Sequence, residues 1–95
     1  MAPGKLPLSD PAWWDNFKQL LDDGYDWPGV YVFKFIVPKQ NVEELKAVFE
    51  GHEIDIKACS TGSYHSLTSR IQVDSSEDVI AIYRAAGSIE GVISL

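Results

Sequence analysis

The stretch Ser60-Thr61-Gly62-Ser63-Tyr64-His65-Ser66-Leu67-Thr68 is a polar turn that runs directly into an alternating strand. Apolar and polar residues alternate on both sides of the turn, from Ile54 to Cys59 and from Tyr64 to Val73. Alternation with a period of two is typical of a strand with one buried face. Gly62 tolerates the positive φ that a tight turn requires. The stretch therefore predicts a β-hairpin at the centre of the fold.

Helical patterns flank the hairpin on both sides. Each shows an apolar stripe with the spacing of an amphipathic helix packed on a sheet. The first stripe consists of Val42, Leu45, Val48 and Phe49, and the second of Val79, Ile82, Tyr83 and Ala86. The expected caps and closing glycines are Asn41 with Glu44 and Gly51 for the first helix, and Ser75 with Asp78 and Gly87 for the second.

Two further strands complete the pattern. Val30 to Val37 is rich in β-branched and aromatic residues and stops at Pro38, and Ile89 to Leu95 forms a short last strand. The order β-α-β-β-α-β predicts an α+β, ferredoxin-like fold: a four-stranded antiparallel sheet with two helices on one face. Both helices are expected on the same face because each has only one apolar stripe to bury. We expect a single domain over residues 1–95, with the ferredoxin-like core in residues 27–95.

Residues 1–26 are predicted to add a lead and an extra N-terminal amphipathic helix. Asp10 and Pro11 suit an N-cap and the first helical position. The helix carries more apolar area than a free surface helix should. It either folds onto its own sheet, covering Val32 and Ile36, or docks on another chain as an interaction helix. Two adjacent tryptophans point in different directions on a helix, so at least one should stay partly exposed. The apolar residues are Trp13, Trp14, Phe17, Leu20 and Leu21.

Composition limits the class of protein. The formal net charge of −6 argues against nucleic acid and anionic membranes as partners, since both need a basic footprint. Cys59 is the single cysteine, so no intramolecular disulfide forms, which fits a reducing compartment. The first residues lack the apolar core of a signal peptide, and no apolar run is long enough to span a bilayer. We expect a soluble, cytoplasmic protein.

The chain from Trp27 to Leu95 resembles the YbeD-like family of small bacterial proteins, a domain of unknown function. The resemblance rests on Trp27-Pro28 followed by Tyr31-Val32-Phe33-Lys34, on the hairpin residues Ser60, Gly62, Tyr64, His65 and Ser66, and on the spacing to the last strand. It implies a fold similar to ACT-type regulatory domains, which bind small effectors, often at dimer interfaces. It implies no catalytic residues, because the family has no established activity.

Cys59 and His65 are close enough in sequence to suggest a nucleophile and its base. The pleat argues against this interpretation. A loop centred on Thr61-Gly62 pairs Cys59 with Tyr64 and Ala58 with His65, and it keeps the apolar residues on one face. Cys59 then faces the open side of the sheet and His65 faces the helices. We predict a structural or hydrogen-bonding role for His65, and a Cys59 sulfur within hydrogen-bond reach of its ring would overturn this.

The same parity predicts a basic cluster on the open face of the sheet. Lys34, Lys57 and Arg70 come from three different strands and share this face. Either they are separate solvated charges, or they form a binding surface for an anion, an acidic peptide or a protein partner. The candidate binding surface consists of Lys34, Lys57, Tyr64, Ser66, Thr68 and Arg70.

Other chemistries fit the residues less well. The Gly62 turn leads into a strand rather than the helix N-terminus that a phosphate loop requires. RNA recognition needs stacking aromatics on the open face, whereas Tyr31 and Phe33 have core parity. Two histidines and one cysteine without ligand spacing do not suggest a metal site, and no cofactor is indicated. We therefore expect a non-enzymatic regulatory or interaction module with a protein partner or self-association. The alternative is a small-metabolite sensor that binds an effector at a subunit interface.

Overall fold

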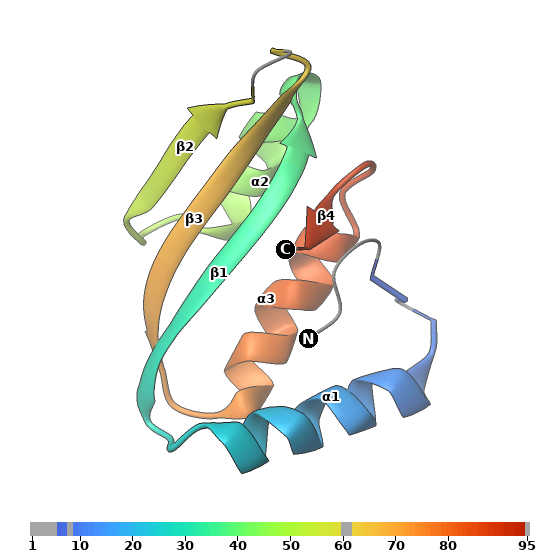
Figure 1. The fold of residues 1–95 in the computed structure, drawn as a ribbon, viewed down its shortest axis with the longest axis vertical. Helices are drawn as coiled ribbons and strands as arrows, with labels where there is room; N and C mark the ends of the chain where they lie inside the picture. Colours follow the sequence, from blue (N-terminus) through green and yellow to red (C-terminus); the bar gives the residue numbers. More distant parts are fainter. Residues whose placement is uncertain (1–5, 8, 60–61, 95) are drawn as a thin grey trace.

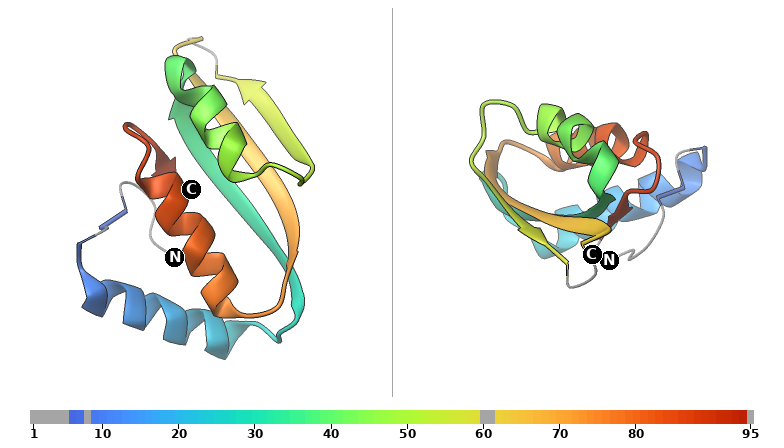
Figure 2. Two further views of the ribbon diagram at one scale, coloured as in Figure 1. Left: turned by 180° about the vertical axis from the view of Figure 1, so that it is seen from behind. Right: turned by 90° about the horizontal axis from the view of Figure 1, so that it is seen from above.

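The computed structural model describes residues 6–7, 9–59 and 62–94 and contains an antiparallel sheet with helices over one face (Figures 1 and 2). Residues 1–5, Leu8, Ser60, Thr61 and Leu95 lie outside the described residues, and part of the predicted hairpin turn falls among them. The order of elements confirms the ferredoxin-like α+β fold with an added N-terminal helix. The elements are α1 (Pro11–Gly24), β1 (Gly29–Pro38), the 3₁₀ turn η1 (Lys39–Asn41), α2 (Val42–Val48), β2 (Ile54–Ala58), β3 (Tyr64–Val73), α3 (Ser76–Gly87) and β4 (Ile93–Ser94).

The register of the sheet agrees with the register that the hairpin predicts. The strands lie in the order β2-β3-β1-β4. Ala58 pairs with His65 and Ile56 pairs with Leu67. The backbone N–H of Cys59 donates to the carbonyl of Tyr64 over 2.9 Å, which continues the same pairing into the turn. The pleat therefore sorts the side chains into the two faces that the sequence predicts.

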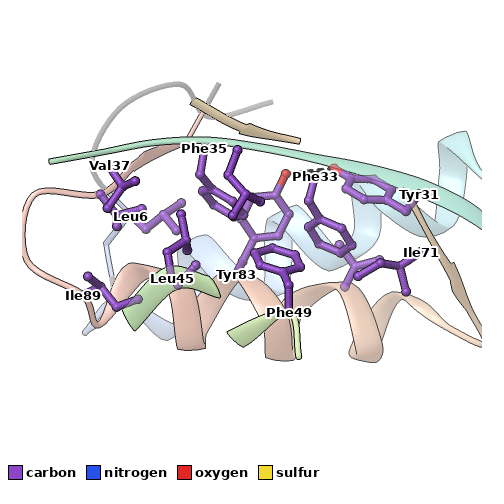
Figure 3. Packing of buried hydrophobic residues seen from close by; sticks show 14 of the residues in the cluster. Leu6, Tyr31, Phe33, Phe35, Val37, Leu45, Phe49, Ile71, Tyr83 and Ile89 are labelled. Carbon is purple, nitrogen blue, oxygen red and sulfur yellow. Dashed lines mark hydrogen bonds between the residues drawn. The ribbon is translucent and has the colours of Figure 1, made fainter. Parts of the chain in front are cut away.

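The core is built around the aromatic residues of β1 (Figure 3). Tyr31, Phe33 and Phe35 are at most 1% exposed and point toward the helices. Tyr83 of α3 packs among them, with its ring centroid 5.6 Å from that of Phe33 and 5.4 Å from that of Phe35. The hydroxyl groups of Tyr31 and Tyr83 are 3.1 Å apart and share a hydrogen bond. Two otherwise costly buried hydroxyls thus satisfy each other.

Helix α1 packs on α3 of its own chain and so contributes to the core. Its buried residues are Trp14, Phe17 and Leu21. The ring of Phe17 meets that of Tyr83 edge to face, with centroids 5.2 Å apart. The guanidinium of Arg84 lies 4.6 Å from the centroid of the Trp14 ring.

The expected location of α1 on the open sheet face is wrong. Val32, which α1 was expected to cover, is 40% exposed. The physical reason is that α3 already carries Tyr83, an aromatic side chain that the rings of α1 can pack against. Trp13 is only partly buried, whereas Trp14 is 2% exposed, which confirms that one of the two adjacent indoles stays partly exposed. The two rings still meet edge to face, with centroids 4.8 Å apart.

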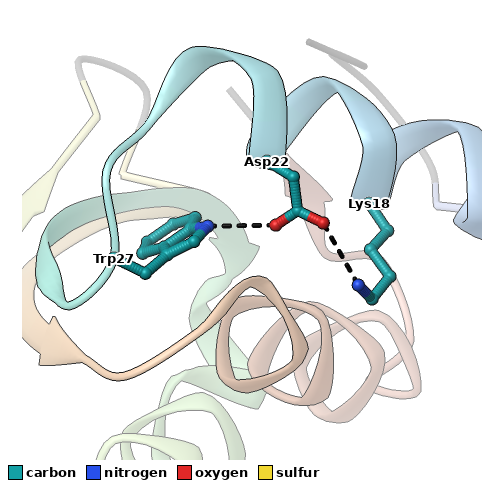
Figure 4. A network of polar contacts seen from close by, with 3 residues as sticks. All are labelled: Lys18, Asp22 and Trp27. Atoms are coloured by element: carbon teal, nitrogen blue, oxygen red, sulfur yellow. Dashed lines mark hydrogen bonds and ion pairs between the residues drawn. The ribbon is translucent and has the colours of Figure 1, made fainter.

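A polar network holds the C-terminal end of α1 (Figure 4). The carboxylate of Asp22 accepts hydrogen bonds from Lys18 Nζ at 3.1 Å and from the indole Nε1 of Trp27 at 3.0 Å. A hydrogen bond from the Ser76 side chain, at the start of α3, is the main reason that the pKa of Asp22 lies below its usual range, and Lys18 adds to it. One carboxylate therefore links α1, the segment before β1 and α3.

The last strand is shorter than the predicted span from Ile89 to Leu95. Within the described part of the chain, β4 consists of Ile93 and Ser94, opposite Ile36 and Phe35, and the predicted end at Leu95 lies outside that part. Ile89 and Val92 are buried in the connection from α3 rather than alternating along a strand. Gly91 has a φ of 81°, and a Cβ at this position would lie 2.5 Å from Pro38 Cγ. The chain therefore bends against Pro38 before pairing begins.

Two of the three predicted helix caps make different bonds from those expected. Asp10 caps α1 by accepting from the Trp13 backbone N–H at 3.2 Å. Asn41 does not cap α2, because its Nδ2 donates to the carbonyl of Glu90 over 2.7 Å. Ser75 precedes α3 without a side-chain cap bond, while Asp78 accepts from the backbone N–H of Asp74. The two capping-box sequences therefore predicted correctly where α2 and α3 begin, but they did not predict the hydrogen bonds that form there.

Replacing Phe17 with Ala should destabilise the fold, because α1 contributes to the same core as the sheet. We expect the free energy of unfolding to fall by about 3–5 kcal/mol, as for other buried aromatic truncations. Chemical denaturation followed by circular dichroism measures the change. Leu20→Ala on the same helix is the matched control, since Leu20 is 53% exposed, and it should change stability by less than about 0.5 kcal/mol. Equal effects of the two variants would contradict the described packing of α1.

The Asp22 network should make stability depend on acid pH. Because the folded-state pKa of Asp22 is lowered, its carboxylate adds stability above its unfolded pKa, and this stability is lost as pH falls through the lower folded pKa. The gap in unfolding free energy between the wild-type protein and Asp22→Asn should therefore narrow below about pH 4. Ser76→Ala should reduce the gap more than Lys18→Met, because Ser76 contributes most to the shift. A gap independent of pH in urea titrations would refute this role.

Candidate binding surface

The predicted cations lie on the open face of the sheet, in neighbouring cross-strand pairs. The register places Lys34 opposite Thr68, Arg70 opposite Val32, and Lys57 opposite Ser66. These residues have the opposite parity to Phe33, Phe35 and Leu67, which are buried beneath the helices. The structure therefore brings together the six residues of the predicted surface: Lys34, Lys57, Tyr64, Ser66, Thr68 and Arg70.

The surface is more mixed in charge than a purely basic cluster. Asp55 pairs with Thr68 and so lies in the same row as Lys34. A depression of about 430 Å³ is lined by Glu53, Asp55, Thr68 and Arg70, together with Ile54. The parity of Asp55 in its strand matches that of Lys57, and this signal could have identified it from sequence. The carboxylates divide the basic cluster, so that Arg70 lies beside acidic groups.

The cations of this face are not held by ion pairs within the part of the chain that the structure describes. The ion pairs found there are Lys18–Asp22 and Lys46–Glu43, both on helices. A cation without an internal carboxylate partner can form a charge-assisted hydrogen bond to an external one at lower cost. Lys34, Lys57 and Arg70 therefore remain available to an anionic group.

Apolar side chains lie between the charged ones. Val32 is 40% exposed and Ile93, which pairs beside Ile36, is 38% exposed. Val30 and Tyr64 on the same face are exposed by 56% and 41%. An exposed apolar stripe with a charged rim is typical of a surface that contacts another molecule. We call this stripe, consisting of Val30, Val32, Ile36 and Ile93, the β1 ridge.

Tyr64 also borders a second hollow at the end of the sheet. A depression of about 510 Å³ lies between Tyr64 and the connection that follows α3, residues 87–93. Ile89, Val92 and Ile93 are among the residues that line it. The hollow lengthens the exposed surface toward the hairpin, whose residues Ser60 and Thr61 are outside the described residues.

Cys59 and His65 lie on opposite faces, as the hairpin register predicts. His65 is opposite Val37 and Ala58, on the helix side, and its Nδ1 is buried without a hydrogen-bond partner among the described residues. Cys59 is a free, partly buried thiol beside Tyr64. His65 therefore lies on the predicted helix side of β3, and it is not positioned to activate Cys59.

The buried tyrosines are not suited to acid–base work near neutral pH. Burial raises the pKa of Tyr31 far above its usual range, and it raises the pKa of Tyr83 as well. Both phenols therefore stay protonated and act as hydrogen-bonding groups in the core. Among the described residues, no group of histidine, cysteine, aspartate and glutamate is arranged to hold a metal ion.

The candidate interaction helix faces its own chain. Trp14 and Phe17 are 2% and 5% exposed, so the residues expected to anchor a partner are largely buried against α3. Trp13 and Leu20 keep part of their surface outside. No helix in the described ranges has both the length and the apolar character needed to cross a bilayer.

Comparison with known sequences places the chain among small bacterial proteins. The family described as "Protein of unknown function (DUF493)" matches residues 22–95. A UPF0250 protein of Idiomarina loihiensis is 30% identical over 82 residues, which cover 79% of this chain and 93% of that protein. A UPF0250 protein of Shewanella loihica is 31% identical over 84 residues, covering 81% and 91% of the two chains.

A UPF0250 protein of Shewanella baltica is similarly close, at 31% identity over 78 residues, with 75% of this chain and 89% of that protein covered. No solved structure gives a significant match. The matched span runs from the end of α1 to the last strand, and so includes the whole sheet and the hairpin that carried the resemblance. The chain belongs to the DUF493 family of small proteins, whose matched curated members carry the name UPF0250.

Proposed function

We propose that the protein is a non-enzymatic regulatory or interaction module of ACT-like type, and that its open sheet face binds an acidic segment of a protein partner. The observation that carries this proposal is the exposed β1 ridge, flanked by Lys34, Lys57 and Arg70 on the same face. Apolar contact supplies affinity, while the cations orient an acidic segment and speed its encounter.

The net charge of the whole molecule determines where an acidic partner can bind. The chain has a net charge of −6, so an acidic partner is repelled from most of its surface. Only a face with exposed, unpaired cations favours such a partner. The carboxylate of Asp55 within the face limits where acidic residues can sit, which adds selectivity for their spacing.

Nucleic acid fits this face less well than an acidic polypeptide. The aromatic side chains of β1 are buried under the helices, and Tyr64 is the one exposed aromatic residue on the described open face. Bases of a single strand require a platform of stacking rings. The carboxylates that line the depression beside Arg70 would also repel a phosphate backbone.

A small-metabolite sensor remains the alternative function. It is favoured by the depression that Glu53, Asp55, Thr68 and Arg70 line, because the hollow offers both signs of charge within one site. A ligand that carries a carboxylate and an amine would find complementary groups there. An effector at this position would also lie close to any molecule bound along the sheet.

Charge reversal tests the preferred function. Lys57→Glu combined with Arg70→Glu should weaken binding of an acidic partner, captured from extracts of the native host and then purified, by at least about tenfold, since two favourable charge contacts become repulsive. Titration calorimetry at two salt concentrations measures the loss. Lys39→Glu combined with Lys46→Glu, on η1 and α2, is the control, because it makes the same change in net charge outside the sheet. Equal binding by both charge variants would contradict the role of the open face.

Thermal unfolding tests the alternative function. A ligand that binds only the folded chain stabilises it by about 2.7 kcal/mol at a hundred times its Kd, which raises the Tm. A screen of amino-acid-like metabolites should then give a Tm shift that Arg70→Ala removes and Lys34→Ala keeps, since Arg70 lines the depression. No shift with any ligand, alongside intact partner binding, would leave only the interaction module.

A further inference from the structure

The outer edge of β1 is only partly covered by a strand. β1 runs from Gly29 to Pro38, but β4 pairs with it only at Phe35 and Ile36. In Figure 1 the short arrow of β4 lies beside the distal part of β1, and no strand lies beside the segment that leaves the turn after α1. The edge of β1 from Gly29 to Phe33 therefore lacks a neighbouring strand among the described residues.

The register shows which backbone groups point toward this edge. The backbone N–H of Lys39 donates to the carbonyl of Ser63, in line with the pairing of β1 and β3. In an antiparallel pair, hydrogen-bonded positions alternate, so the odd-numbered residues of β1 bond to β3. The N–H and C=O groups of Val30 and Val32 consequently point away from β3. No loop, helix end or side chain in the described ranges forms a hydrogen bond with them.

The composition of this edge makes it suited to pairing. The segment Gly29-Val30-Tyr31-Val32-Phe33 has high β propensity and no charge, and it contains neither proline nor lysine. Proteins usually protect a free edge with such residues or cover it. Val30 is 56% exposed, so the side-chain surface beside the edge is open as well. An extended segment added here would gain backbone hydrogen bonds and apolar contact together.

We propose that this edge pairs with the same edge of a second copy of the chain, antiparallel and with the two-fold axis at Tyr31. Val30 of one copy then lies opposite Val32 of the second copy, and the two residues exchange both of their backbone hydrogen bonds. The two sheets join into one continuous sheet, and the β1 ridge continues across the interface. This association uses the sheet edge and not the open-face cations, so it stands or falls separately from the proposed function.

The short β4 limits both the segment that can pair with the free edge of β1 and the register of that pairing. In a pair centred on Tyr31, residues 29–33 of one copy lie opposite residues 33–29 of the other. Each chain bends at Trp27-Pro28, just before it would meet β4 of the other copy. A register two residues further along would bring Gly29 of the second copy against Phe35, where Ser94 already pairs.

A register-specific charge swap tests this proposal on the full chain. Val30→Lys with Val32→Lys places like charges opposite each other at both ends of the pair, and we expect the dimer Kd to rise at least about tenfold. Val30→Glu with Val32→Lys places opposite charges across the same pair and should restore association. Sedimentation velocity from about 1 µM to about 1 mM chain measures both.

Circular dichroism and Tm of each variant confirm that the chain is folded, and both positions are on the exposed face, where a charge does not disturb the core. Val32→Pro is a second, independent variant, because it removes an outward N–H without breaking a bond to β3. Lys57→Glu with Arg70→Glu should leave the dimer intact. A wild-type chain that stays monomeric over the whole range would overturn the proposal. So would a dimer that the double-lysine variant leaves unchanged, or one that the charge swap does not restore.

Discussion

The alternation of side chains along β1 is the constraint on which the rest of the structure depends. Tyr31, Phe33, Phe35 and Val37 are directed into a core that both α3 and α1 share. The intervening residues are directed to the open face, whether or not their side chains are polar. A shift of one residue would bury Lys34 and expose the three aromatic rings. Core burial therefore fixes which side chains form the candidate binding surface, and the exposed valines follow from the same pleat.

The core shows how a chain of 95 residues uses the same aromatic side chains to join the sheet, α3 and α1. A domain of this size buries a modest fraction of its surface, so each aromatic residue contributes to several interfaces. Tyr83 meets Phe17 on one side and Phe33 and Phe35 on the other. Its hydroxyl is satisfied by Tyr31. Helix α1 is therefore part of the core, and the Asp22 network fixes the end of that helix to the start of α3.

The sequence was sufficient to predict the fold and the faces because both depend on periodicity and on one turn. The hairpin register placed Ile56 against Leu67 and separated Cys59 from His65, and the structure agrees. The position of α1 was not predictable in the same way. An apolar stripe shows that a helix must be buried, but not against which element, and here Tyr83 provides the partner ring.

The remaining differences come from long-range contacts that local patterns do not encode. Asn41 bonds to Glu90 instead of capping α2, and Gly91 turns against Pro38 and shortens β4. Asp55, in contrast, could have been placed on the binding surface from its parity alone, and its omission made the cluster look more basic than it is. The shortened strand matters most for the proposed self-association, since it leaves the outer backbone of Val30 and Val32 without a strand partner among the described residues.

Amide hydrogen exchange along β1, followed by NMR at low and high chain concentration, tests the central assignment of this strand most directly. The backbone amides of Tyr31, Phe33 and Phe35 should be strongly protected at every concentration, because they bond to β3. Those of Val30 and Val32 should exchange quickly when dilute and become protected as the chain concentrates. Uniform protection of all five amides in dilute protein, or rapid exchange at Tyr31 and Phe33, would contradict the account.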